Sequence, residues 1–195
     1  MSDFARLEFI GREEVQNRLA RVPQVSEAGA ALALNRTATF AKQQGIARIL
    51  EAKLFPKSYL QQRIETSRAS TSNLRATLTA RARETLQSRF PNRQLYTKGK
   101  TVARKKAGIE SQVKVAGGPK ILPGAFYVRL RAGKVAGAGA LAIAIRLPGA
   151  RRAYEVLRTT SVHHAFKDVL PQVADQAAAN LESQLRIELD KALAR

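Results

Sequence analysis

Apolar residues recur at three- and four-residue steps in the first third of the chain, which is the spacing of one face of an α-helix. One such stretch covers residues 12–22, and a longer, Ala-rich one runs from Glu27 to about Leu54. A shorter helix is expected over residues 58–66. The pattern therefore predicts a helical part over residues 11–66, in which Gly45 either bends the long helix or splits it in two.

The strongest helical pattern lies near the other end of the sequence, over residues 161–194. Pro171 is expected to force a kink or a fresh start there, because proline lacks the backbone N–H that a helix interior uses. Beyond it, apolar residues repeat in four-residue steps along one stripe, which we expect to pack against a sheet or a neighbouring subunit. The stripe consists of Val173, Ala177, Leu181, Leu185, Leu189 and Leu193.

Between these helical parts the pattern changes to a period of two, which is typical of half-buried β-strands. The alternating segments Phe126–Leu130 and Leu141–Leu147 flank a turn at Ala132-Gly133-Lys134 and predict a central antiparallel hairpin. The strand-rich part covers residues 73–158. Within it, strands are also expected over residues 74–80, 112–116 and 153–158, and an exposed loop over residues 89–108.

Segregated helices and strands predict an α+β fold in one domain, residues 1–195. A long N-terminal helix and a long C-terminal helix flank a small antiparallel sheet that contains the central hairpin. Hydrophobic residues make up 45% of the chain, which is enough for a packed core. No stretch approaches the roughly 20 apolar residues that a membrane-spanning helix needs, so no membrane partner is expected.

The net charge of +19 changes the picture because it is unevenly distributed. Residues 61–152 carry 20 basic and 3 acidic side chains, whereas the segments on either side are close to neutral. A surface of this kind suits an anionic partner such as nucleic acid or an acidic protein. The basic side chains are densest in the predicted loop, which contains Lys98, Lys100, Arg104, Lys105 and Lys106.

This basic loop is the one candidate binding site in the sequence. Lys and Arg neutralise phosphates without reading base sequence. The five residues are candidates for contact with DNA or with an acidic ring of protein, and a solvated loop is the third interpretation. They lack the interleaved aromatic residues of a single-strand platform.

Catalytic and metal-binding patterns are poor, so no enzymatic activity and no cofactor are expected. The chain has no Cys, and its two histidines, His163 and His164, are adjacent on a predicted helix and point about 100° apart. Gly117-Gly118-Pro119-Lys120 lacks the spacing of a phosphate-binding loop and is interpreted as a turn. The acids of the basic middle (Glu65, Glu84 and Glu110) are interpreted as partners of nearby Arg residues.

Several landmarks together resemble the minor tail protein Z family of long-tailed bacteriophages. The run from Ala30 to Ala38, which contains Asn35-Arg36, is similar to a helix of that family. Pro123-Gly124-Ala125-Phe126 resembles its turn into a central hairpin. Thr160, Ala165, Phe166, Pro171 and Gln184-Leu185-Arg186 resemble its C-terminal pattern, and the order and spacing agree over nearly the whole chain. Two departures are a strand at Leu141–Leu147 that is richer in Ala and Gly and a loop that is less densely basic.

The resemblance implies a structural virion protein that completes the tail. It implies a homo-oligomeric, hexameric ring in the neck, assembled in the cytoplasm of a bacterial host and needed for head–tail joining or DNA positioning. The implied partners are the tail terminator, head connector or stopper proteins, and the end of the phage DNA in the channel. The alternative, which explains the charge but not the landmarks, is a free basic protein that coats or compacts DNA.

Overall fold

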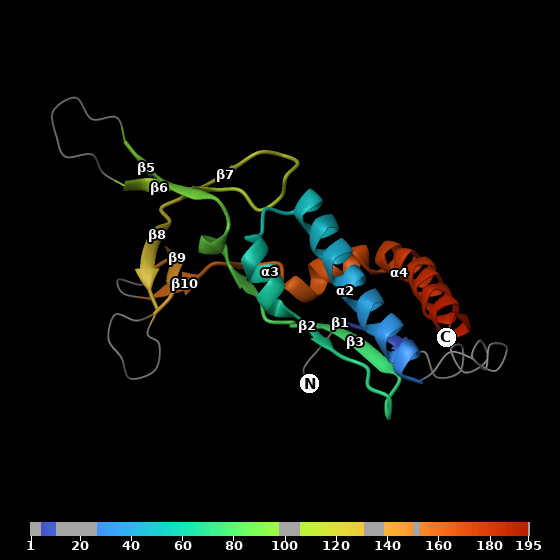
Figure 1. The fold of residues 1–195 in the computed structure, drawn as a ribbon. Coiled ribbons are helices and arrows are strands. Elements are labelled where there is room, and N and C mark those ends of the chain that lie inside the picture. Colours follow the sequence, from blue (N-terminus) through green and yellow to red (C-terminus); the bar gives the residue numbers. More distant parts are fainter. Residues whose placement is uncertain (1–4, 11–26, 98–105, 131–138, 150–152, 195) are drawn as a thin grey trace. The chain divides into compact units, whose positions relative to one another are not determined.

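The structure is a computed structural model that describes residues 5–10, 27–97, 106–130, 139–149 and 153–194 (Figure 1). Its contacts divide the chain into two compact units. The first, the helical unit, comprises residues 1–49, 57–83 and 162–195, and the second, the β-unit, comprises residues 50–56 and 84–161. A single domain over the whole chain stays a prediction, because compactness does not show whether either unit folds by itself.

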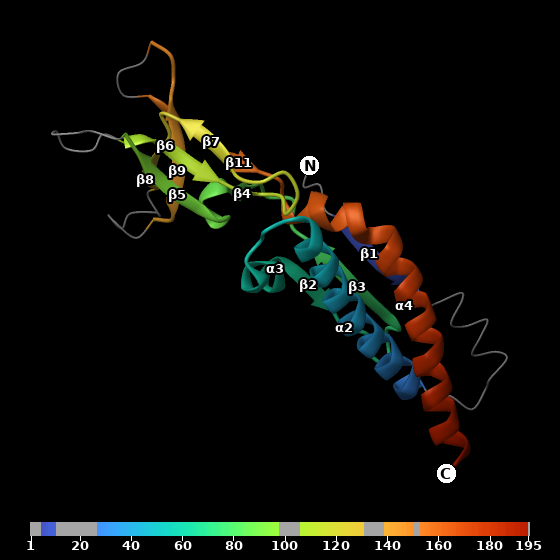
Figure 2. The same cartoon turned by 90° about the horizontal axis from the view of Figure 1, so that it is seen from above.

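The helical unit places two long helices against a three-stranded sheet. α2 (Glu27–Ala52) and α4 (Val162–Leu193) run side by side (Figure 2). They are antiparallel, since Arg36 contacts Glu188 while Gly45 contacts Phe166. The sheet has the order β1-β3-β2, with antiparallel neighbours, and α3 (Lys57–Arg63) leads directly into β2. Its strands are β1 (Ala5–Ile10), β2 (Ile64–Ser67) and β3 (Arg75–Ala80).

Small side chains let the long helices approach the sheet and each other. Ala31, Leu34 and Ala38 of α2 pack on Ala69 and Ala76, and all five residues are buried. On the neighbouring face of α2, Ala30 is covered by Leu74 and by a set of leucines from α4, namely Leu181, Leu185 and Leu189. The Ala-rich pattern of the sequence therefore corresponds to a close helix–helix contact.

Gly45 neither splits α2 nor ends it. It lies where the ring of Phe166 meets the helix, and a Cβ atom at this position would stand 2.7 Å from Cε2 of that ring. Gly45 is thus required by packing, since no side chain fits between the α2 backbone and Phe166.

The β-unit contains two three-stranded antiparallel sheets, β5-β6-β7 and β10-β9-β8, and a short pair, β11-β4. Residues of the two larger sheets share one core around Ile109, Ala125 and Ile143, which are all buried. The elements are β4 (Thr85–Leu86), the 3-10 helix η1 (Gln87–Arg89), β5 (Asn92–Tyr96), β6 (Lys106–Ser111), β7 (Lys120–Pro123), β8 (Phe126–Arg129), β9 (Leu141–Arg146), β10 (Tyr154–Val156) and β11 (Arg158–Thr159).

The α+β class, the long helices and the central hairpin are confirmed, because β8 and β9 pair antiparallel as expected. The strands form several small sheets, however, where one sheet was expected. The predicted helical part over residues 11–66 is described only from Glu27 onward, and its last residues, from Ile64, belong to β2.

Two local predictions are wrong, and a third is wrong in part. The exposed loop over residues 89–108 is too wide, since β5 and the start of β6 form a ladder within it. The strand expected at residues 112–116 is only an isolated bridge between Lys114 and Lys53. Pro171 lies inside α4, which continues past it, so the expected fresh start is wrong, whereas the expected kink stays a prediction. Proline removes only one helical hydrogen bond, and the packing of Phe166 and Val173, both fully buried, holds α4 on either side of it.

We expect Gly45→Ala to destabilise the protein by about 1–3 kcal/mol, although alanine is the better helix former. The added methyl group has no room beside the Phe166 ring. Chemical denaturation of the two single variants and of the double variant Gly45→Ala/Phe166→Leu measures the coupling. The double variant should recover part of the loss, and strict additivity of the two single effects would contradict the contact.

Candidate functional site

The predicted basic loop is the connection between β5 and β6. Lys98, Lys100, Arg104 and Lys105 lie outside the residues that the structure describes. Lys106 is the exposed first residue of β6 and is paired in register with Tyr96, the last residue of β5. The sequence therefore located a basic hairpin connection, while the relative placement of its five cations stays a prediction.

The positive charge of the chain follows the division into units. The β-unit contains 17 basic and 4 acidic residues, a net charge of +13, whereas the helical unit contains 17 basic and 11 acidic residues, a net charge of +6. Both counts cover the full sequence of each unit. The sequence showed a basic middle, and the fold shows that most of this excess belongs to one compact body.

The three acids of the basic middle have the local roles expected of them. Glu65 pairs with Arg81 at 2.5 Å, Glu84 pairs with Arg158 at 3.9 Å, and Glu110 forms an ion pair with Arg93 across β5 and β6. Each is a cross-strand or near-neighbour contact of the kind that stabilises a sheet modestly. These carboxylates are therefore engaged with arginines.

One face of the sheet β10-β9-β8 carries an aromatic and cationic cluster that sequence reasoning missed. The guanidinium carbon of Arg146 lies 5.2 Å from the centre of the Phe126 ring, which is within cation–π range. The Tyr154 ring meets Phe126 edge to face, with ring centres 6.0 Å apart. The alternation was visible in the sequence, but the pairing of Tyr154 with Arg146 was not, because residues 147–153 separate β9 from β10.

The apolar stripe of α4 divides into three parts. Val173 and Ala177 are fully buried, and Leu181, Leu185 and Leu189 are half-buried against Ala30 of α2. Leu193 is 60% exposed and lies beyond this contact. The stripe thus packs within the helical unit along most of its length, and packing against a neighbouring subunit stays a prediction.

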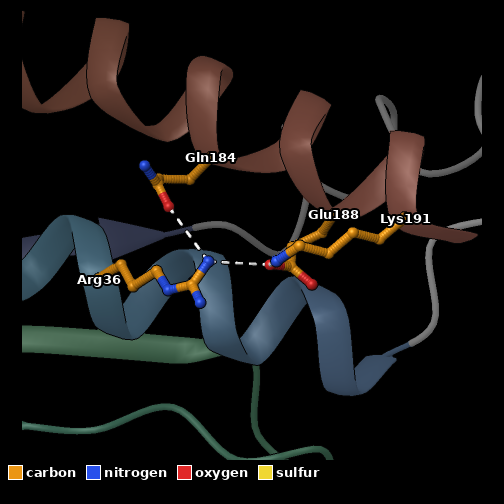
Figure 3. A network of polar contacts seen from close by, with 4 residues as sticks. All are labelled: Arg36, Gln184, Glu188 and Lys191. Carbon is orange, nitrogen blue, oxygen red and sulfur yellow. Dashed lines mark hydrogen bonds and ion pairs between the residues drawn. The ribbon is translucent and has the colours of Figure 1, made fainter.

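A polar cluster lies beside this stripe at the contact of α2 and α4 (Figure 3). Arg36 donates from Nη1 to Glu188 Oε1 at 2.9 Å and to Gln184 Oε1 at 3.5 Å. Lys191 donates to the same Glu188 oxygen at 2.9 Å. The hydrogen bond from Lys191, together with the charges of both cations, lowers the pKa of Glu188 below its ordinary value although desolvation opposes this.

The histidines form no metal site within the described part of the chain. His163 is buried and His164 is exposed, with ring centres 5.3 Å apart in an edge-to-face arrangement. Among the described residues, no group of three or more His, Cys, Asp or Glu side chains is placed to hold a metal ion.

Described residues line an open groove in each unit. The groove of the β-unit has a volume of about 570 Å³ and is lined by Phe55 and Phe90, whose ring centres are 4.7 Å apart, with Lys53 and Arg89 beside them. The described residues that line it include no His, Asp, Glu or Ser. Its described lining is therefore mainly apolar and cationic.

Within the described parts of the chain, no helix is both long enough and apolar enough to cross a membrane. Comparisons of the chain with protein-family models, with curated proteins and with solved structures gave no match.

We expect Leu181→Ala and Leu185→Ala each to destabilise the helical unit by about 1–3 kcal/mol. Both side chains are half-buried, so the cost falls below the roughly 2–5 kcal/mol of a fully buried leucine. Leu193→Ala is the matched control and should stay within about 0.5 kcal/mol of the parent. Urea denaturation compares the three, and equal effects at all three positions would show that the stripe is not packed as described.

We expect Glu188→Gln to destabilise the protein by about 1 kcal/mol at neutral pH. The lowered pKa means that the folded state favours the carboxylate, so this stabilisation is present above the ordinary pKa of 4.5 and is lost as the pH falls through the lowered value. The difference in unfolding free energy between parent and variant should therefore shrink as the pH drops below about 4.5. Denaturation curves of parent and variant at several pH values measure this difference. If the difference did not change with pH, the ion pairs of Glu188 would not be its cause.

Proposed function

We propose that this chain is a structural subunit of the neck of a long-tailed bacteriophage, where it completes the tail. The observation that carries the proposal is the segregation of charge: a unit built on two long helices supplies packed structure, and a separate β-unit carries a net charge of +13. Such a division suits a protein that assembles through one part and meets an anionic partner through the other.

The residues behind the family resemblance have structural roles, which supports treating them as landmarks. The Asn35 side chain brackets the backbone of Ala69, donating to its carbonyl at 3.0 Å and accepting from its N–H at 2.8 Å. Arg36 joins α2 to α4. Gly124 has a φ of +69°, a conformation that glycine adopts freely, and forms the turn between β7 and β8.

Assembly into a ring would multiply the positive charge that each β-unit contributes. In a closed symmetric assembly each charge recurs in every subunit, so a modest set of cations per chain becomes a continuous girdle. The six-fold number comes from the family resemblance. Self-repulsion across the girdle opposes assembly, and an anionic partner within the screening length of about 8 Å offsets it. DNA in the channel or an acidic neighbouring ring provides such a partner.

The proposed location is the virion, at the head-proximal end of the tail, after assembly in the bacterial cytoplasm. The proposed partners are further copies of the chain, the tail terminator, and a head connector or stopper protein. The positive β-unit equally suits a free protein that coats DNA. A coating protein binds DNA tightly as a monomer with steep salt dependence, whereas a neck subunit forms a closed ring and remains in the particle.

We expect replacement of the five cations of the basic loop by Gln to leave the chain folded and to lower the yield of infectious particles at least tenfold. The reason is loss of the girdle that meets DNA or the neighbouring ring. The measurement is complementation of a particle-producing genome that lacks the parent gene, with circular dichroism of the purified variant. The replaced residues are Lys98, Lys100, Arg104, Lys105 and Lys106.

The control variant removes five positive charges from the helical unit and should retain near-parental particle yields. Its replaced residues are Lys57, Arg68, Arg83, Lys167 and Arg186. Labelled antibody should place the parent protein at the neck. Parental yields from the loop variant, or a protein found only at the distal tip or absent from particles, would refute the proposal.

A further inference from the structure

We infer that the outer face of the sheet β10-β9-β8 binds unpaired bases of single-stranded nucleic acid by stacking. This goes beyond the phosphate contacts of the basic loop and does not depend on where the chain is assembled. The cluster of Phe126, Arg146 and Tyr154 forms the centre of this face.

The strand register defines the face. Phe126 lies opposite Ala144, which lies opposite Val156, and Tyr154 lies opposite Arg146. Side chains directly opposite each other in antiparallel strands project from the same side of the sheet, and alternate residues share that side. The intervening residues Tyr127 and Ile143 belong to the core of the β-unit, so the alternate set faces away from it. This outward face consists of Phe126, Val128, Ala142, Ala144, Arg146, Tyr154 and Val156.

Planar groups on this face suit flat ligands. Its central strand contributes Ala142 and Ala144, which are fully buried, and the exposed Arg146. The Phe126 and Tyr154 rings of the flanking strands meet edge to face, and the Arg146 guanidinium lies over the Phe126 ring. Tyr154 is 42% exposed and Arg146 is exposed as well, so a ring and a guanidinium plane are both accessible to a ligand.

The positive charge on and around this face favours an anionic ligand. Its one ionisable cation is Arg146, none of its seven residues is acidic, and the β-unit that carries it has a net charge of +13. Aromatic rings that accept stacked bases, beside cations that follow a phosphate backbone, are how proteins hold single strands without reading sequence. A duplex keeps its bases paired and offers this face only phosphates. Charge complementarity thus favours a single-stranded nucleic acid over an apolar protein segment.

The test compares a fluorescent 20-nucleotide oligothymidine with an abasic oligonucleotide of the same length and phosphate number, at one fixed salt concentration. The parent protein should bind the oligothymidine roughly tenfold more tightly, since stacking contributes only when bases are present. Equal affinity for the two probes would reduce the interaction to phosphate contacts and overturn the inference.

The decisive variants change the ring without changing the charge. Tyr154→Leu should lose most of the preference for bases, Tyr154→Phe should keep it, and neither should alter binding of the abasic probe. Arg146→Lys keeps the charge but not the planar group, and should weaken only the oligothymidine complex. Ile121→Ala, which trims an exposed side chain elsewhere on the β-unit, is the control and should behave as the parent.

Thermal melts establish that each variant is folded. If Tyr154→Leu kept the full preference for bases, the bases would stack elsewhere and the inference would be wrong. If Tyr154→Leu instead dissociated an oligomer while the parent showed no base preference, the face would be a contact between copies of the chain. The result of this test can be distinguished from the result of the neck proposal. The preference for bases is measured on purified protein, whereas the location of the protein is measured on particles.

Discussion

The close antiparallel contact of α2 with α4 is the constraint on which the helical unit depends. It joins residues more than a hundred positions apart, and it is possible only because α2 presents glycine and alanine where α4 presents Phe166 and leucines. Packing of small against large side chains fixes the separation of the helices. The bonds of Arg36 to Glu188 and of Thr37 to Asn180 then fix how far one helix slides along the other, since a shift of one turn leaves these polar groups unpaired.

The stability of the β-unit depends on a different balance, between a small apolar core and a large net charge. Its described core is small and centres on Ile109, Ala125 and Ile143, while its sequence carries 17 cations against 4 acids. Like charges on a small body repel one another and lower its stability. An anionic partner that binds only the folded unit stabilises it by mass action. The excess of positive charge thus makes the stability of the unit dependent on salt and on any anion that binds the folded unit.

The sequence predicted the elements of this fold better than their connections. The period of four in α4 follows from one face that is buried, and the period of two in β8 and β9 follows from the pleat of a strand, so both could be predicted. Gly45 could not be interpreted from local pattern, because its role depends on Phe166, which lies in another helix. The fresh start expected at Pro171 was wrong for the same reason, since buried residues on either side of it hold α4 as one helix. The face around Tyr154 depends on strand register across a connection, which the sequence does not show.

The order of the units along the chain has a consequence for biosynthesis. The main segment of the β-unit, residues 84–161, is a continuous insertion between parts of the helical unit, and α4 follows it. All residues of the β-unit are therefore synthesised while α2 still lacks the helix that covers Ala30 and Gly45. Until α4 emerges, the apolar side of α2 is open to chaperones or to misassembly, so the helical unit is completed only after the β-unit has been synthesised.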